Sequence, residues 1–412
     1  LADGPGGQGL GLLQAAASPR HVAASGAPPQ PVPIQGNLTL EHFSRRAAGG
    51  CYSRSSRSQL AVVDAHLHAR PFGGEPVPFE ELVAWLRDSG VLFATMFGLG
   101  QRLPVSSNCT YYLDCPGTVV EPSMKNDFDN AQSFLDSHDE LSSPKGPYVV
   151  LSMSFPDLQN PEGILPRMQL LQKEYRGMFK IMGEVNVVKQ ALWNNSAGLP
   201  VAIAAIQNWA PFMKVLREHG LPLALHSDIG SDKEPFQFLP LMDKILELYP
   251  DNKVVWLHMG GLSKQLTPLP LSLVSRADPM YAADHIKVLT ERLKQHPNLM
   301  IDLAWDVLYY AIYTVKAKRA LYAEMLNDFP TRFITGTDFV AAETKPEAQY
   351  QAELGRTSVI LKDLNDEAFR RIALGQNYFD LLGLDFVAPQ VCDEGGAGTR
   401  SVGARARAPR AR

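Results

Sequence analysis

Eight short apolar segments rich in Val, Ile and Leu alternate with longer segments of helical period, and this alternation limits the folds open to the chain more than any other feature. The segments predicted as helices often end at Gly or Pro, as in PFEELVAWLRDSG and WAPFMKVLREHG. Repeated strand–helix units predict a parallel sheet with crossover helices, and eight of them in about 330 residues indicate an α/β fold of the (β/α)8 TIM-barrel type. The predicted strands cover residues 60–68, 91–99, 148–155, 178–187, 221–226, 253–258, 299–305 and 332–338.

The barrel domain is predicted to cover residues 56–388. Residues 1–55 are rich in Gly, Ala and Pro without a sustained period, and residues 389–412 form an Arg-rich tail, so both are expected to be largely disordered. No GxGxxG or GxxxxGK[ST] motif follows a predicted strand, which leaves an open nucleotide-binding sheet without support.

Composition bears on the class of protein and on its partners. A hydrophobic fraction of 45% and a charged fraction of 20% allow a sizeable core, and a net charge of −4 gives no reason to expect a nucleic-acid or membrane partner. No apolar run reaches the roughly 18 residues that span a bilayer. The chain does not begin with Met, so we expect a processed or incomplete start, and the choice between a cytoplasmic and an exported protein stays open, as does homo-oligomerisation.

The four cysteines are too few and too scattered to predict a disulfide framework, and none lies in a CxxC pair of the zinc-binding type. Cys109 and Cys115 are close enough in sequence to bridge in an oxidising compartment. A pair of free thiols is an alternative at least as well supported.

Chemically active side chains follow several of the predicted strands. In VVDAHLHARP, Asp64, His66 and His68 alternate along one strand and are expected to share a face that points into the barrel. The carboxyl ends of barrel strands carry the active sites of such enzymes, and other strands also end in imidazoles or carboxylates. These further residues are Glu184 on strand four, His226 on strand five, His258 on strand six and Asp338 on strand eight.

Four imidazoles and two carboxylates at one end of a barrel predict a site for a divalent cation. Uncompensated carboxylates are costly to bury, whereas a cation gives carboxylates and neutral imidazoles a common partner. Mixed nitrogen and oxygen ligands suit zinc, with manganese, iron or nickel as chemical alternatives. A bound cation would create a hydroxide nucleophile near neutral pH, and a neighbouring carboxylate would move the proton.

The ordered set of HxH on strand one, His on strands five and six, and Asp on strand eight resembles the amidohydrolase superfamily. DAHLH, GTDF and IALGQNYFDLLGL are similar, more narrowly, to the amidohydrolase-related group that includes aminocarboxymuconate semialdehyde decarboxylase. The resemblance spans roughly residues 60–385. It implies that His66, His68 and Asp338 hold one metal, and that His226 and His258 hold a second metal or share the first.

The resemblance also implies a bridging ligand from strand four when two metals are bound, either a carbamylated Lys or a Glu. Lys180 and Glu184 lie on this strand, about 13 Å apart at roughly 3.3 Å per residue, and Glu184 is nearer the carboxyl end. Glu184 is therefore the predicted bridge. Lys189 would serve only if the strand were longer than predicted. In single-metal relatives the strand-six histidine acts as an acid–base group, so the resemblance implies that His258 is either a metal ligand or a catalytic residue. Asp338 is expected both to bind the metal and to act as the base.

The long segment after strand two, residues 100–127, is predicted to shape a substrate pocket. Arg102 in this segment could bind a substrate carboxylate, or could be a surface residue. Trp305 after strand seven is expected to contribute an apolar wall.

The resulting hypothesis is a metal-dependent hydrolase that cleaves an ester, lactone or amide of a small molecule, with one or two zinc ions per chain. One alternative is a zinc-dependent non-oxidative decarboxylase on the same scaffold. Another is an inactive barrel that serves as a binding module. A nuclease of the TatD type also uses a strand-four Glu, but no basic groove is evident in the sequence.

Overall fold

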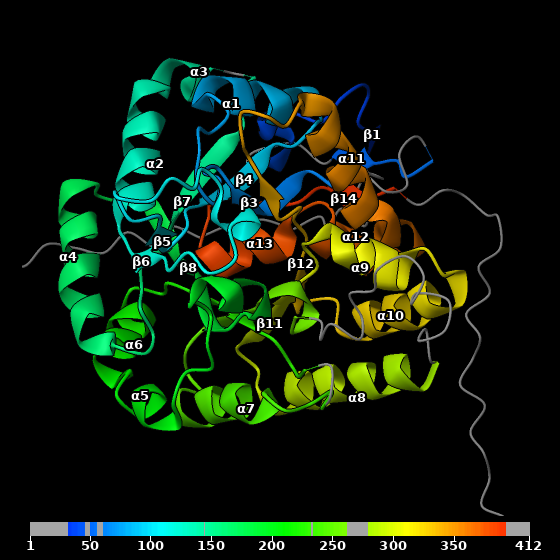
Figure 1. The fold of residues 1–412 in the computed structure, drawn as a ribbon. Helices are drawn as coiled ribbons and strands as arrows, with labels where there is room; N and C mark the ends of the chain where they lie inside the picture. The colour runs from blue at the N-terminus through cyan, green and yellow to red at the C-terminus, as the bar shows by residue number, and fades with distance from the viewer. Residues whose placement is uncertain are drawn as a thin grey trace, which may run out of the picture.

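The computed structural model describes residues 32–45, 50–55, 61–143, 145–231, 234–261 and 279–392 (Figure 1). Within this part of the chain, no helix combines the length and the apolar character needed to cross a membrane. The predicted tails lie mostly outside the described residues.

A parallel sheet of nine strands forms the centre of the molecule, and neighbouring strands follow the order β12-β11-β10-β9-β8-β7-β4-β3-β13. All eight segments predicted as strands contribute to it. The nine strands are β3 Val63–His68, β4 Phe93–Phe97, β7 Tyr148–Met153, β8 Phe179–Val188, β9 Leu223–Ser227, β10 Val254–Trp256, β11 Leu299–Asp302, β12 Phe333–Ile334 and β13 Phe339–Val340.

The segment predicted as the eighth strand closes this sheet into a barrel. Its first part, β12, pairs with β11, and its continuation, β13, pairs with the first barrel strand, β3. Between the two, the Ala65 amide donates to the Thr335 carbonyl at 2.9 Å and the Asp338 amide donates to the His66 carbonyl at 2.7 Å. The α/β barrel predicted from the sequence is therefore confirmed.

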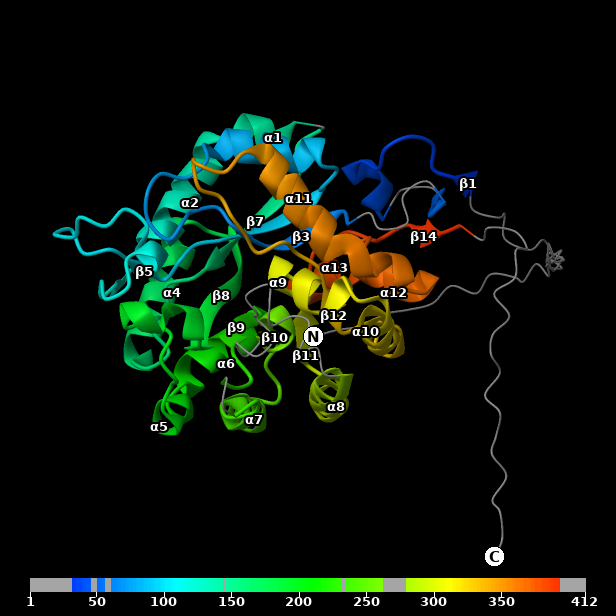
Figure 2. The ribbon, with the colours of Figure 1, turned by 45° about the vertical axis from the view of Figure 1, so that its right-hand side comes forward.

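Helices surround the sheet, as Figure 1 and Figure 2 show. Helix α1 illustrates why they pack there: Leu82, Val83 and Leu86 are buried on one face, whereas Glu81 and Arg87 on the other face are exposed. The bounds are α1 Phe79–Asp88, α2 Lys125–Asp136, α3 His138–Ser142, α4 Ile164–Glu174, α5 Ile203–Gln207, α6 Ala210–Glu218, α7 Leu239–Leu248, α8 Pro279–Gln295, α9 Asp306–Leu308, α10 Lys316–Asp328, α11 Glu347–Thr357, α12 Asp366–Ile372 and α13 Gln376–Leu382.

A small parallel sheet joins the two ends of the described chain. It contains β1 Val32–Pro33, β2 Gly50–Tyr52 and β14 Gln390–Val391. A disulfide between Cys51 and Cys392 links the same segments. These residues fall in the two terminal segments that the sequence predicts to be largely disordered. Regular structure therefore extends beyond the predicted barrel domain at both of its ends. The domain boundaries themselves stay a prediction.

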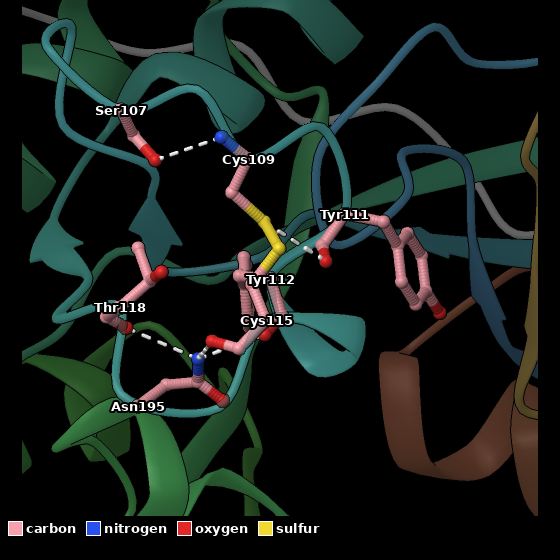
Figure 3. Close-up of a disulfide and its surroundings, with 7 residues drawn as sticks. All are labelled: Ser107, Cys109, Tyr111, Tyr112, Cys115, Thr118 and Asn195. Atoms are coloured by element: carbon pink, nitrogen blue, oxygen red, sulfur yellow. Dashed lines mark hydrogen bonds between the residues drawn. A yellow bond between two sulfur atoms is a disulfide. The ribbon is translucent and has the colours of Figure 1, made fainter.

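A second disulfide, Cys109–Cys115, closes a short loop in the long segment after β4 (Figure 3). All four cysteines are thus paired, and the expectation that no disulfide framework exists is wrong. The spacing of the cysteines along the sequence did not reveal this pairing, because Cys51 and Cys392 come together only when the two ends of the described chain fold against each other. The antiparallel hairpin of β5 Gln101–Arg102 and β6 Glu121–Pro122 belongs to the same long segment.

The side chain of Asn195 holds this loop against the barrel (Figure 3). Its Nδ2 donates to the carbonyl oxygens of Tyr112 at 2.8 Å, Cys115 at 3.0 Å and Thr118 at 3.0 Å. Beneath the loop lies a small hydrophobic cluster, here called the lid cluster, which contains Phe72, Leu99, Tyr112, Val120, Leu192 and Val340.

Candidate metal centre

The two histidines of β3 point their Nε2 atoms toward each other, 3.3 Å apart. The Nδ1 atom of His66 lies 2.8 Å from Asp302 Oδ2, and that of His68 lies 3.0 Å from the Gly98 carbonyl. A neutral imidazole that donates Nδ1–H to such an acceptor presents an unprotonated Nε2, as a metal ligand requires. Both side chains are fully buried.

Asp338 completes a group with these histidines. Its Oδ1 lies 3.4 Å from His66 Nε2 and 3.3 Å from His68 Nε2. The residue has a positive φ of 61°, which is uncommon outside glycine, and its amide bond to the His66 carbonyl fixes it there. Residues held in such sparsely populated conformations cluster at functional sites.

Glu184 on β8 reaches the same point from the far side of the barrel, with Oε2 at 3.2 Å from His68 Nε2. One ligand atom from each of His66, His68, Glu184 and Asp338 lies within 4.8 Å of the others. The structure therefore brings together four residues that are widely separated in sequence.

Lys189 also enters the site, and it follows directly after β8, which ends at Val188, one residue later than predicted. Its Nζ lies 2.8 and 2.9 Å from the two carboxylate oxygens of Glu184. Burial raises the pKa of Glu184, but the charges of Lys189 and His226 outweigh burial and hold this pKa well below its usual range. Lys180, in contrast, lines a separate hollow beside Tyr148 and Arg176.

His226 and His258 lie on the other side of Glu184. His226 Nδ1 is 2.5 Å from Glu184 Oε1, and its Nε2 is 3.0 Å from Asp228 Oδ1, so carboxylates flank both ring nitrogens. His258 places Nε2 at 3.4 Å from Glu184 Oε1 and Nδ1 at 3.2 Å from the Ala304 carbonyl. Glu184, His226 and His258 form a second group able to hold a cation.

Asp302 is the residue that the sequence reasoning missed. It ends β11, and its carboxylate contacts His66 Nδ1 at 2.8 Å and the His258 amide at 2.5 Å. With His66 and His258 it forms a third potential ligand group. A signal was available, since Asp302 lies in the seventh predicted strand just as Asp338 ends the eighth.

Asp64 does not join any group of candidate ligands with the two histidines, and the shared face expected for it stays a prediction. Its carboxylate accepts hydrogen bonds from the Thr337 amide at 2.9 Å, the Thr337 hydroxyl at 2.8 Å and the Tyr350 hydroxyl at 3.2 Å. The register of β3 against β4 shifts after Asp64, an irregularity in the pairing of the two strands.

The electrostatics of the site favour a cation. Burial lowers the pKa of His68 and His258, but the neighbouring carboxylates, chiefly Asp338 and Glu184, outweigh burial and raise both pKa values to about 9. The site thus holds positive charge in the form of protons where imidazoles and carboxylates converge. A divalent cation bound by neutral imidazoles would supply the same charge, so the donor set fits a metal ion.

The two residues predicted to bind substrate are placed differently. The indole ring of Trp305 lies 5.3 Å from the ring of His258, beside the metal centre. Arg102 lies on the β5–β6 hairpin and pairs with Glu121 at 3.1 Å. Its contact with a substrate stays a prediction.

A closed barrel with clustered His, Glu and Asp side chains at the carboxyl ends of its strands is the framework of a metal-dependent barrel enzyme. A family model described as "Amidohydrolase" matches residues 182–376, a range that includes Glu184, His226, His258 and Asp338. Residues 182–376 thus form an amidohydrolase-family domain, and the protein is an enzyme.

Solved structures with a similar fold include dihydroorotase from Campylobacter jejuni, at 13% identity and a TM-score of 0.43, covering 78% of this chain and 83% of the other. Another is 2,6-dihydroxybenzoate decarboxylase from Rhizobium, at 13% identity and 0.41, covering 78% and 98%. A third is β-aspartyl dipeptidase from Fervidobacterium islandicum, at 12% identity and 0.42, covering 80% and 74%. No curated protein sequence matches the chain significantly. Sequence identities and TM-scores as low as these do not indicate the substrate of this protein.

Proposed function

We propose that the protein is a metal-dependent hydrolase that cleaves an ester, lactone or amide bond of a small molecule. The observation that carries this proposal is the convergence of His66, His68, Glu184 and Asp338, whose ligand atoms lie within 4.8 Å of one another. Zinc is the proposed metal, because the donors are imidazole nitrogens and carboxylate oxygens. When bound, such a cation lowers the pKa of water and polarises a carbonyl oxygen.

The protein's own groups have separable duties in this proposal. Asp338 is the base: burial raises the pKa of its carboxyl, but the charges of His258 and His66 outweigh burial and keep the pKa low, so the group is ionised and able to accept a proton. Asp302 and Gly98 orient the imidazoles of His66 and His68 through their Nδ1 atoms. His258 would donate or accept a proton, or would serve as a ligand together with His226.

One observation favours a second candidate, a single-metal decarboxylase. Both oxygens of Glu184 are paired with the ammonium of Lys189, which neutralises the carboxylate that would otherwise bridge two cations. With Glu184 paired in this way, one ion would be held by His66, His68 and Asp338.

Metal analysis of the purified protein, combined with a substrate panel, tests these alternatives. A content near two ions per chain with turnover of esters, lactones or amides supports the hydrolase, whereas a content near one with release of carbon dioxide supports the decarboxylase. We expect Asp338→Asn to lower kcat by at least about 10²-fold, the usual contribution of a general base.

Asp385→Asn is the matched control, because the Asp385 side chain is 85% exposed and pairs with Arg45. It should retain the activity of the unaltered protein. A fully metal-loaded protein that is inactive in both assays would instead be a binding module.

A further inference from the structure

Three Asn-X-Ser/Thr motifs lie among the described residues, and all of them lie outside the candidate metal centre. They are Asn37-Leu38-Thr39, Asn108-Cys109-Thr110 and Asn194-Asn195-Ser196. Such a motif, with any residue but Pro in the middle, is the acceptor for an N-linked glycan on the Asn side chain. It also arises by chance, so the exposure of each Asn and the compartment in which the chain folds decide whether it is used.

All three acceptor asparagines are exposed and lie outside the strands of the barrel. Asn37 lies between β1 and β2, and Asn108 lies in the long segment after β4. Asn194 lies near the end of a short 3-10 helix, η4 Gln190–Asn195, which follows β8. The Ser or Thr that completes each motif is exposed as well. Each site therefore has room for a bulky group.

The cysteines indicate the compartment. All four are paired, in the disulfides Cys51–Cys392 and Cys109–Cys115. Disulfides persist in oxidising compartments such as the secretory pathway and are rare in the reducing cytosol. N-linked glycosylation belongs to the same pathway, because its acceptor motif marks surface loops of secreted proteins. The pairing of the cysteines and the exposure of the asparagines thus point independently to one environment.

Strongly exposed apolar side chains lie near the first two acceptors. Val32, which is 71% exposed, lies five residues before Asn37, and Val105, which is 89% exposed, lies three residues before Asn108. Exposed apolar surface favours self-association. An N-linked glycan is bulky and solubilising, so one attached at each Asn is able to cover the apolar side chain beside it.

The third acceptor, Asn194, has exposed apolar side chains in two neighbouring segments. Its carbonyl accepts a hydrogen bond from the Gly117 amide at 2.7 Å, so the segment that carries Val119 runs beside η4. Leu199 lies five residues after Asn194. Val119 and Leu199 are 56% and 57% exposed. All three acceptors therefore lie where a hydrophilic cover would be favourable.

We propose that Asn37, Asn108 and Asn194 carry N-linked glycans, acquired in the oxidising compartment where the two disulfides form. At each site the Asn Nδ2 loses a proton and bonds to the anomeric carbon of an oligosaccharide diphosphate donor. The bond from that carbon to the phosphate oxygen breaks, and the diphosphate leaves with its electron pair. The proposal is independent of the reaction catalysed at the metal centre.

Peptide mass spectrometry of the protein purified from its own cells tests the three sites. Treatment with a peptide N-glycosidase in heavy-oxygen water converts each glycosylated Asn to an Asp that carries the heavy isotope, so all three positions should be labelled. Asn208 is the internal control, because it is exposed but lies outside any such motif. An unlabelled position overturns the proposal for that site. Alkylation of all four cysteines without prior reduction would overturn the assigned compartment.

Variants secreted from insect cells separate the motif from the fold. Thr110→Val destroys the second motif but keeps Asn108 and the disulfide, so it should lose one glycan. Thr110→Ser keeps the motif and should keep the glycan, and the matched control Asn208→Gln should keep all three. Equal glycan numbers in Thr110→Val and the unaltered protein would show that Asn108 is not an acceptor.

Light scattering before and after removal of the glycans tests their covering role. The deglycosylated protein should self-associate at lower concentration than the glycosylated protein, because apolar side chains such as Val105 are then uncovered. The triple variant Val32→Ser/Val105→Ser/Leu199→Ser should lose this difference. Equal self-association of the two forms of the unaltered protein would overturn the covering role.

Discussion

The ammonium of Lys189 lies within hydrogen-bonding distance of both carboxylate oxygens of Glu184, at 2.8 and 2.9 Å, in the interior of the barrel mouth. Both side chains are more than nine-tenths buried. A buried ion pair of this kind gives little net stability by comparison with apolar residues, but the loss of one partner leaves a costly isolated charge. The stability of the metal-free protein therefore depends on the presence of both Lys189 and Glu184.

Replacing Lys189 with Met should expose this dependence. In the presence of a chelator we expect the free energy of unfolding to fall by about 3–5 kcal/mol, because Glu184 keeps its burial and loses the ammonium that pairs with both of its oxygens. Added metal should stabilise the variant more than it stabilises the unaltered protein, since a cation can replace the ammonium. Urea unfolding with and without metal measures both effects. Lys189→Arg, which retains the charge, is the control, and equal unfolding midpoints for Lys189→Met and the unaltered protein in chelator would contradict the expectation.

Asp302→Asn should weaken metal binding without removing any of the six predicted ligands. Asp302 orients His66 through Nδ1 and His258 through its backbone amide. Loss of a carboxylate that orients a metal-binding histidine usually lowers metal affinity about 10–100-fold. Competition with a chromophoric chelator gives the dissociation constant. Asp306→Asn, at the first residue of α9 and paired with Arg356 at 3.4 Å, provides a matched control that should bind metal normally.

The sequence could predict the barrel because its evidence is local. Each strand is a short apolar run and each helix has an apolar face, as in α1. The period of the hydrophobic pattern is therefore enough to predict the alternating strands and helices. The candidate site could be predicted for a related reason: residues such as His226 and Asp338 end their strands, and parallel strands in a barrel end on one rim.

Other features depend on contacts that no local pattern encodes. The register of β3 is irregular after Asp64, and β8 ends one residue later than predicted, directly before Lys189, which pairs with Glu184. Strand ends are the least certain part of any such prediction, because pairing with neighbours decides them. The Cys51–Cys392 disulfide likewise depends on the meeting of segments 341 residues apart.

That disulfide should contribute more to stability than Cys109–Cys115, which spans 6 residues. In the chain-entropy account, a cross-link stabilises by restricting the unfolded chain, and the effect grows with the logarithm of the enclosed length. Replacing Cys51 and Cys392 with Ser should lower the free energy of unfolding by about 2–5 kcal/mol. The Cys109→Ser/Cys115→Ser variant should lose less. Denaturant unfolding under oxidising conditions compares them, and a larger loss in the second variant would refute the ranking.

His285 should make the protein sensitive to moderate acid. Its Nε2–H donates to the Met259 carbonyl at 2.8 Å, and its Nδ1 lies 2.7 Å from the Tyr322 hydroxyl. Burial lowers the pKa of His285 from 6.5 to about 4. The unfolded chain therefore binds the proton more tightly than the folded protein does. The resulting stability is present above pH 6.5 and is lost as the pH falls toward 4, by about 2 kcal/mol at pH 5.

The variant His285→Leu isolates this effect, because it removes the titrating group. Its free energy of unfolding will be lower at every pH, since the Met259 carbonyl loses a donor, so the pH dependence is the quantity to compare. In chelator, the decrease between pH 7.5 and pH 5 should be about 2 kcal/mol smaller for His285→Leu than for the unaltered protein. His219→Leu, at an exposed position after α6, should keep the full decrease. Parallel pH profiles for His285→Leu and the unaltered protein would show that His285 is not the group responsible.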